Sequence, residues 1–281
     1  LFAGSDMQKR DLFDCLNRGG MACFALTEPG AGSDAGAVSC RAEKVEGGYI
    51  LNGTKCFITN APIADKITLF ANTREGGGIR GLTVFLVDAD TKGISIGKEE
   101  DKMGIRASAT AEIIFEDCFV PDSARVGKEG RGFMIAMQTL QMSRPVVAAI
   151  SVGIAQAAIE AAVAYSHHRK QFGVKIATFE MVQQMIADMV MKTEAARILT
   201  YKACVAQMNK DKKAGLYSAM SKCFASDTAM EVTTTAVQVM GGNGYSRENP
   251  VEKYMRDAKI MQIYEGTNQV QRLVIANETT F

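Results

Sequence analysis

Residues 181–190 read Met-Val-Gln-Gln-Met-Ile-Ala-Asp-Met-Val, and their apolar side chains recur at a helical spacing. The apolar positions are i, i+4, i+5, i+8 and i+9, occupied by Met181, Met185, Ile186, Met189 and Val190. That periodicity predicts an amphipathic helix. Similar segments rich in Ala, Met, Gln and Lys continue on both sides. We therefore predict helices at about 131–167, 176–209, 213–240, 250–263 and 268–277, three of them long enough to pack as an antiparallel bundle.

Proline, glycine and threonine mark the interruptions of these helices. Pro145 should kink the first helix, because proline lacks a backbone N–H and clashes with the preceding turn. The glycines of Gly241-Gly242-Asn243-Gly244 break the third helix. Glu265-Gly266-Thr267 separates the last two helices, and Thr267 is placed to cap the final one.

The first half of the chain has a different composition, which changes near residue 130. Residues 1–132 hold 19 of the 26 glycines. Short β-type runs at 49–51, 66–70, 82–87 and 111–115 alternate there with Gly and Asp turns. This spacing is typical of an antiparallel sheet or barrel. The predicted fold class is α+β, with an antiparallel β-barrel domain at 21–130 followed by an antiparallel α-helical bundle at 131–281.

Composition narrows the classes of function. The 281 residues include 32 basic and 31 acidic side chains, a formal net charge of +1, without a long block of like charge. This disfavours a nucleic-acid partner. Seven scattered cysteines without a Cys-x-x-Cys pair favour reduced thiols in a bacterial cytoplasm or a mitochondrial matrix, and a zinc site would lack ligands. Residues 145–165 are apolar but rich in alanine and contain Glu160, which favours a buried helix over a membrane span.

Two segments of the first half carry groups suited to a flat or phosphorylated ligand. Thr27-Glu28-Pro29-Gly30-Ala31-Gly32-Ser33-Asp34 combines glycines, which let a ligand approach the backbone, with two hydroxyls. A tight barrel turn explains the same residues equally well. In Phe57-Ile58-Thr59-Asn60, strand alternation sends Phe57 and Thr59 to one face, where a ring and a donor could flank a planar cofactor. Ordinary core with a turn is the alternative.

Two segments of the second half place charged groups at helix ends. His167-His168-Arg169-Lys170-Gln171-Phe172-Gly173 puts cations where they complement a helix C-terminus, or gives Arg169 a phosphate partner. The two histidines have no acidic partner at ligand spacing, so we predict no metal site. In Tyr264-Glu265-Gly266-Thr267, desolvation of the carboxylate would raise its pKa toward that of a general base. A solvated glutamate at a helix end is the alternative.

Taken together, these segments resemble the acyl-CoA dehydrogenase family, of the FAD-dependent short- or medium-chain type, over about residues 5–277. The matching motifs are LTEPGAGSD at 26–34, NGTK at 52–55, FITN at 57–60, RKQFG at 169–173, QVMGGNGY at 238–245, RDAK at 256–259 and IYEGTNQ at 263–269. Each motif is moderately specific, and their order makes coincidence negligible.

The resemblance implies FAD lying between a β-barrel and a helical bundle. Thr59 would hydrogen-bond the flavin N5 region beside Phe57, which stands where the family usually carries tryptophan. Arg169 and its companions at 172, 238, 241 and 242 would hold the pyrophosphate and adenine half from a neighbouring subunit, which implies an oligomer, typically a homotetramer. The implied cofactor-binding residues are Phe24, Leu26, Thr27, Gly32, Ser33, Phe57, Thr59, Arg169, Phe172, Gln238, Gly241, Gly242, Thr267 and Gln269.

The resemblance also implies the reaction. Glu265 matches the catalytic base that removes the α-proton of an acyl-CoA thioester, while its main-chain N–H and a flavin ribityl hydroxyl stabilise the enolate charge. A hydride passes from the β-carbon to the flavin, a trans-2-enoyl-CoA results, and electron-transferring flavoprotein reoxidises the FAD. The implied substrate-binding residues are Ser33, Arg144, Tyr264 and Gly266. Gln141 stands where many straight-chain members carry aspartate, so chain length is not implied.

Two rival functions use the same residues. An enoyl-CoA reductase of this fold would run the reaction in reverse with the same base and flavin, and the redox partner would decide the direction. A non-catalytic truncated paralogue would serve as an assembly subunit, although a scaffold needs no base aimed at a flavin. The helical domain that precedes the barrel in the family is represented only by a remnant at 1–20, so we expect an N-terminally truncated chain whose true start lies upstream of Leu1.

Overall fold

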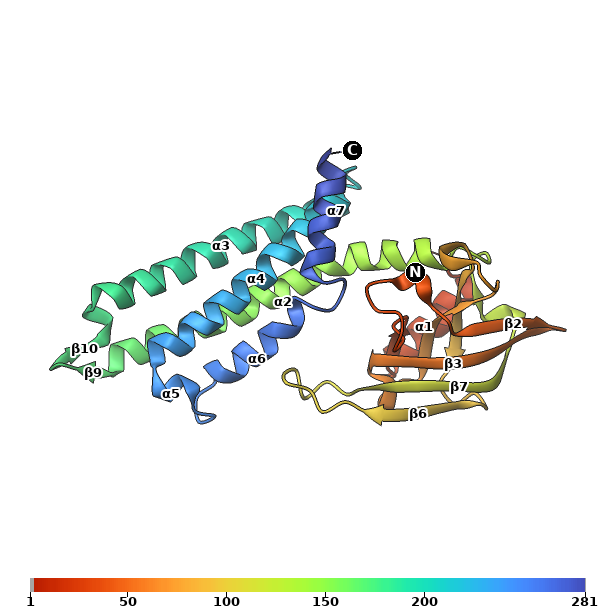
Figure 1. Cartoon of the computed structure of the whole chain (residues 1–281), viewed down its shortest axis with the longest axis horizontal. Helices are drawn as coiled ribbons and strands as arrows, with labels where there is room; N and C mark the ends of the chain where they lie inside the picture. The colour runs from red at the N-terminus through yellow and green to blue at the C-terminus, as the bar shows by residue number, and fades with distance from the viewer. Residues whose placement is uncertain (1–2, 281) are drawn as a thin grey trace. The chain divides into compact units, whose positions relative to one another are not determined.

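The computed structural model describes residues 3–280, which form two compact units (Figure 1). The sheet unit comprises the residues up to 102 together with 106–138, and the helical unit comprises 103–105 and the residues from 139 onward. The predicted α+β class is confirmed, with a sheet first and helices after it.

The sheet unit contains one eight-stranded sheet. Its strands are β1 (Ala22–Ala25), β2 (Arg41–Val45), β3 (Gly48–Thr59), β4 (Lys66–Asn72), β5 (Leu82–Asp88), β6 (Ile94–Glu99), β7 (Thr110–Pro121) and β8 (Arg125–Val126). The order is β6-β7-β3-β2-β4-β5-β8, with β1 beside β4. The pairings are antiparallel except for β1 with β4 and a single residue pair that joins β2 to β4.

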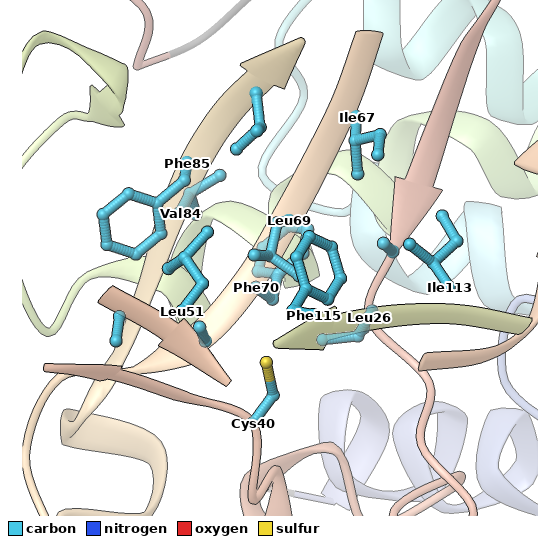
Figure 2. Packing of buried hydrophobic residues seen from close by; sticks show 14 of the residues in the cluster. Leu26, Cys40, Leu51, Ile67, Leu69, Phe70, Val84, Phe85, Ile113 and Phe115 are labelled. Carbon is cyan, nitrogen blue, oxygen red and sulfur yellow. The ribbon is translucent and has the colours of Figure 1, made fainter. Parts of the chain in front are cut away.

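Large apolar side chains from these strands fill the core of the sheet unit. Figure 2 shows Phe70, Phe85 and Phe115 among aliphatic neighbours from four strands. The Tyr49 ring packs edge-on against Phe85 with centroids 5.0 Å apart. Each fully buried Leu, Ile or Phe side chain contributes roughly 1.5–3 kcal/mol, so this core gives a rigid support for the loops at the strand ends.

Short helical segments complete the sheet unit. Helix α1 (Asp6–Asn17) begins with a capping box in which Ser5 and Gln8 satisfy each other's backbone N–H. It is tied to β4 by an ion pair between Asp11 and Lys66 at 2.6 Å. The 3₁₀ turns of the sheet unit are η1 (Ala35–Ala37), η2 (Ala61–Ile63), η3 (Gly78–Arg80) and η4 (Asp122–Ala124).

The helical unit follows the predicted helices closely. Its helices are α2 (Gly132–His168, whose first turns belong to the sheet unit), α3 (Glu180–Met208), α4 (Ala214–Met240), α5 (Gly242–Tyr245), α6 (Val251–Met261) and α7 (Asn268–Thr280). A hairpin of β9 (Lys170–Gln171) and β10 (Val174–Lys175) follows α2. Helix α3 starts later than predicted because Ile176–Thr178 forms the 3₁₀ turn η5. Helix α2 continues through Pro145, and the kink expected there stays a prediction.

Helix α4 is the most buried helix of this unit, and its buried side chains are mostly small. Alanine, serine and threonine let neighbouring helices approach it closely, and several of the hydroxyls donate to carbonyls within the helix itself. Ser226 donates to the Lys222 carbonyl at 2.7 Å, and Thr233 donates to the Ala229 carbonyl at 2.7 Å. One large residue, Lys222, is fully buried among them.

Helix α2 is long and apolar enough to span a membrane by length and composition. Its most apolar window has a mean hydropathy of 1.9, and 44% of that window is buried inside the structure. Core helices pass the same test, so this finding alone is weak evidence for a membrane span.

Candidate active site

The turn between α6 and α7, residues 262–267, carries the carboxylate that the sequence singled out (Figure 1). Asn268 N–H donates to the Gln262 carbonyl at 3.0 Å and closes the turn. Thr267 Oγ1 accepts the Val270 N–H at 3.3 Å, so the predicted cap of the last helix is confirmed. Glu265 has φ +59° and Gly266 has φ +84°. A left-handed conformation strains a residue such as glutamate by about 1–2 kcal/mol, and such strain persists only where the surroundings enforce it.

The Glu265 carboxyl group is half-buried and has one close partner. The Ser143 hydroxyl, on α2, donates to its Oε2. Burial raises the pKa of Glu265, while the Ser143 hydrogen bond and the charges of Arg144 and Lys222 oppose that rise. The net direction is upward, as the sequence predicted for this segment. A carboxylate with a raised pKa is a stronger base than an exposed one.

Three side chains hold the carbonyl groups of the turn. Arg144 Nε lies 3.4 Å from the Glu265 carbonyl, and Gln271 Nε2 donates to the carbonyls of Glu265 and Gly266 at 3.2 and 3.0 Å. Lys222 Nζ donates to the Gly266 carbonyl at 2.8 Å. Within residues 3–280, the main-chain N–H of Glu265 donates to no acceptor. The turn is therefore fixed through its carbonyls, while the main-chain N–H groups of Glu265, Gly266 and Thr267 donate to no acceptor among the described residues.

Residues flanking Glu265 shape its surroundings. Burial and the Glu265 charge raise the pKa of Tyr264 to about 12, and its hydroxyl lies 2.9 Å from the sulfur of Met261. At Gly266 a Cβ atom would lie 2.5 Å from Gln271 Nε2. Glycine is required there both by the positive φ and by this close approach.

The far side of the turn meets a polar network centred on Asp227 of α4. Its carboxylate accepts from Gln262 at 2.6 Å, from Asn268 at 2.7 Å and from Arg272 at 2.6 Å. An open cleft of about 360 Å³ lies beside this network. Its lining includes two of the predicted cofactor residues, Thr267 and Gln269, together with Asp227, Lys259, Gln262, Ile263, Asn268 and Arg272.

In the sheet unit, the glycine-rich loop is anchored by a buried ion pair. Lys55 Nζ lies 2.7 Å from Glu28 Oε1 and 3.0 Å from the Leu26 carbonyl, and both charged side chains are buried. Glu28 also accepts from the N–H and hydroxyl of Ser39 and from the Cys40 N–H, at 2.7–2.9 Å. Burial opposes ionisation, but Lys55 and these donors outweigh it, so the pKa of Glu28 is lowered.

The predicted cofactor residues of the sheet unit lie in β1, in this loop and at the end of β3. The Thr27 carbonyl accepts the Cys56 N–H at 2.9 Å, which places the loop beside the end of β3. Phe57 and Thr59 are exposed while Ile58 is buried. Phe57 has φ +55° at a register shift in β3, so a bulge sets its direction. Gly32 and Ser33 are exposed, Leu26 is buried, and Phe24 packs on Phe70.

A second set of predicted cofactor residues lies at the other end of the helical unit (Figure 1). Arg169 and Phe172 belong to the β9–β10 hairpin, and the Phe172 ring is 95% exposed. Gln238, Gly241 and Gly242 are exposed at the end of α4 and the start of α5. Gln238 lies sixteen residues beyond Lys222 on α4, roughly 24 Å away at 1.5 Å per residue. A single flavin or adenine ring therefore cannot contact both ends of the helical unit.

Several residues of the site were not predicted from the sequence. Ser143, Lys222 and Gln271 contact the Glu265 turn from α2, α4 and α7. A signal existed for Lys222, because it stands in Ser221-Lys222-Cys223-Phe224-Ala225-Ser226, a run of mostly small residues typical of a buried helix face. A lysine in such a face must find oxygen partners.

The fold and this site define a class of protein. It has a sheet unit and a helical unit, and the turn between the last two helices carries a half-buried carboxylate with a raised pKa. Family models described as acyl-CoA dehydrogenase middle domain and C-terminal domain match residues 23–118 and 130–279. The chain belongs to the acyl-CoA dehydrogenase family, whose members are FAD-dependent oxidoreductases.

Individual relatives agree with this assignment. A probable acyl-CoA dehydrogenase of Mycobacterium tuberculosis is 48% identical over 98% of this chain and 71% of its own length. The structure of butyryl-CoA dehydrogenase from Megasphaera elsdenii matches with a TM-score of 0.96 and 46% identity, covering 99% of this chain and 73% of that one. A chain in a structure described for the electron transferring flavoprotein of Acidaminococcus fermentans matches with a TM-score of 0.96 and 49% identity, with the same coverage.

The residues present fit an FAD molecule. A Cβ added at Gly30, Gly32, Gly241 or Gly242 would meet nothing within 4 Å, so the backbone there is open to a ligand. Phe57 and Phe172 are 63% and 95% exposed, and such rings are suited to covering a flat aromatic group. Within the described residues, no cluster of His, Cys, Asp or Glu is suited to a metal ion.

Proposed function

We propose that this protein dehydrogenates an acyl-CoA thioester between its α and β carbons, giving a trans-2-enoyl-CoA and passing the electrons to electron-transferring flavoprotein. The half-buried Glu265, held in a left-handed turn with a raised pKa, is the observation that carries the proposal. Glu265 would take the α-proton on its carboxylate. The free main-chain N–H of Glu265 would donate to the thioester oxygen as negative charge develops there.

The other residues around the turn would orient these two groups. Arg144 and Gln271 hold the Glu265 carbonyl, which fixes the direction of the adjoining peptide. The Ser143 hydroxyl holds one carboxylate oxygen. Tyr264, Gly266 and, in the sheet unit, Ser33 are the proposed neighbours of the acyl chain and thioester. Desolvation strengthens each of these interactions relative to bulk water.

We further propose two sets of residues that hold FAD. In the sheet unit these are Phe24, Leu26, Thr27, Gly32, Ser33, Phe57 and Thr59, and in the helical unit Arg169, Phe172, Gln238, Gly241, Gly242, Thr267 and Gln269. When bound, FAD supplies the acceptor for the hydride that leaves the β-carbon. Arg169 would pair with the pyrophosphate, for which a guanidinium is suited. The match to the Acidaminococcus chain supports electron-transferring flavoprotein as the oxidant.

Assembly into a homotetramer is part of the same proposal. Five apolar residues on α3 recur at heptad spacing and are each more than half exposed: Met191, Ile198, Tyr201, Val205 and Met208. An exposed seam of this kind suits a helix of a second copy. The seven cysteines are all free thiols, which supports the bacterial cytoplasm or mitochondrial matrix as the location.

Flavin bleaching by acyl-CoA thioesters tests the proposed function. The purified protein should carry FAD and lose its visible absorbance anaerobically with at least one thioester from a panel of straight, branched, cyclic and aromatic acyl groups. Glu265→Gln should keep FAD and slow bleaching by at least about a thousandfold, because the amide cannot take the proton.

Glu278→Gln is the matched control, since this exposed glutamate on α7 lies outside the proposed site. It should bleach like the unsubstituted protein. Undiminished bleaching by Glu265→Gln would remove Glu265 from its role, and a protein that cannot be loaded with FAD would overturn the whole proposal.

A further inference from the structure

Lys222 is a buried lysine whose partners differ from those of an ordinary structural ion pair. Its side chain is fully buried in the first half of α4. Its Nζ atom donates to the Gly266 carbonyl at 2.8 Å and to Asn268 Oδ1 at 2.9 Å, both neutral oxygens. The other fully buried lysine, Lys55, contacts the carboxylate of Glu28 at 2.7 Å. Lys222 therefore carries a buried charge that its direct contacts do not neutralise.

Both acceptors of Lys222 belong to the segment that carries Glu265. Gly266 follows Glu265 directly, and its carbonyl accepts from Gln271 as well. The Asn268 amide is itself fixed to α4, because its Nδ2 donates to Ser226 Oγ at 2.8 Å and to Asp227 Oδ1 at 2.7 Å. Hydrogen bonds at Gly266 and at Asn268 thus hold the turn against helix α4. A left-handed glutamate needs such external support.

We propose that Lys222 is a positioning residue for Glu265: its ammonium group fastens the α6–α7 turn to α4 and supplies a buried positive charge that favours the carboxylate form of Glu265. The inference rests on the proposed function, in which Glu265 is the base. Burial of a cation without an opposite charge in direct contact is unfavourable, so a charge at this position calls for an explanation.

The charged groups around Lys222 agree with this role. Arg144 from α2 disfavours its charge, whereas Glu265 from the turn and Cys223 and Asp227 from α4 favour it. Burial is the largest influence and lowers the pKa of Lys222 to about 8, so the side chain is charged at neutral pH. Asp227 already pairs with Arg272 at 2.6 Å, which leaves Glu265 as the acid whose charge is not matched by a direct ion pair.

Titration of Glu265 by carbon-13 NMR tests the inference without acyl-CoA. The FAD-loaded protein would be labelled at the glutamate carboxyl carbon, and the Glu265 signal would be assigned by its loss in Glu265→Gln. In Lys222→Gln, which keeps a donor and removes the charge, the midpoint should rise by about one pH unit. In Lys222→Arg, which keeps the charge, it should stay within about a third of a unit of the original. An unchanged midpoint in Lys222→Gln would overturn the inference.

A matched control separates this effect from general damage to α4. Thr233→Val alters another fully buried polar side chain of the same helix, whose hydroxyl bonds only within α4. It should leave the Glu265 midpoint unchanged. If the Lys222 variants do not fold, the unsubstituted protein carries the test, since its Glu265 signal should show a second step as Lys222 loses its proton near pH 8. A Glu265 signal that stays unchanged while the Lys222 ammonium loses its proton would contradict the inference.

Bleaching kinetics distinguish this inference from the proposed function. Below both midpoints, Lys222→Gln should bleach about tenfold more slowly than the unsubstituted protein, because one pH unit changes the carboxylate fraction tenfold. Above both midpoints, this tenfold factor should disappear. A protein that no acyl-CoA bleaches overturns the proposed function, whereas normal bleaching with an unshifted midpoint in Lys222→Gln overturns only the role of Lys222.

Discussion

At the scale of single residues, the ionisation of Glu265 links the chemistry of the site to the stability of the chain. Burial raises its pKa above the ordinary value of 4.5. A carboxyl group with a raised folded-state pKa stabilises the protein fully below the unfolded pKa. That contribution is lost as pH rises through the folded value. The ionised Glu265 carboxylate therefore destabilises the folded state at the pH values at which it can act as a base.

We expect Glu265→Gln to become progressively more stable than the unsubstituted protein as pH rises from about 4.5 through the raised pKa. Glutamine keeps the size and an oxygen for Ser143 but does not ionise. Urea unfolding at a series of pH values would measure the difference in free energy of unfolding. A difference that does not vary with pH would contradict the raised pKa.

At the scale of a structural element, the buried ion pair between Lys55 and Glu28 anchors the glycine-rich loop. We expect Lys55→Met to lower the free energy of unfolding by about 3–5 kcal/mol, because it leaves the Glu28 charge buried without its partner. Adding Glu28→Gln should recover part of the loss. Denaturant midpoints would measure both effects, and purified protein should show reduced FAD content if the loop lines the cofactor.

An exposed ion pair gives the control for this prediction. Arg41 and Glu75 lie 3.0 Å apart with both side chains mostly in solvent. Arg41→Met should change the free energy of unfolding by less than about 1 kcal/mol. An equally small effect of Lys55→Met would show that the buried pair does not anchor the loop.

The long helices and four of the strands were predicted from the sequence, while strands β1, β2 and β6 and the contacts between elements were not. Helix ends at Met240 and Asn268 follow local signals, a glycine after the first and a threonine cap before the second. Ser143 and Glu265, by contrast, are 122 residues apart, and nothing in either local sequence indicates their hydrogen bond. Such partners depend on how helices pack, which a single sequence does not reveal. The parallel pairing of β1 with β4 was missed for the same reason.

At the scale of the whole molecule, the two ends of the helical unit carry different parts of the proposed cofactor site. If Arg169 serves a neighbouring subunit, two inactive variants should complement each other. We expect co-expressed Arg169→Ala and Glu265→Gln chains to regain about a quarter of the active sites, because random pairing joins both intact residues at one site in four. Flavin bleaching of the purified mixed oligomer would measure the recovery.

Each variant expressed alone provides the control for the complementation, and both should be inactive. A mixed oligomer without activity would place Arg169 and Glu265 of one chain at the same site. An active Arg169→Ala protein on its own would show that Arg169 does not hold the cofactor. Size-exclusion chromatography with light scattering would give the oligomeric state of the same sample.

The left-handed backbone at Glu265 has a consequence for how this protein can change over generations. Only glycine adopts that conformation without penalty, yet glycine has no carboxylate to offer. Selection for heat tolerance alone would favour replacing the acid, and selection for turnover would restore it. Selection for stability and selection for catalysis therefore favour different residues at position 265.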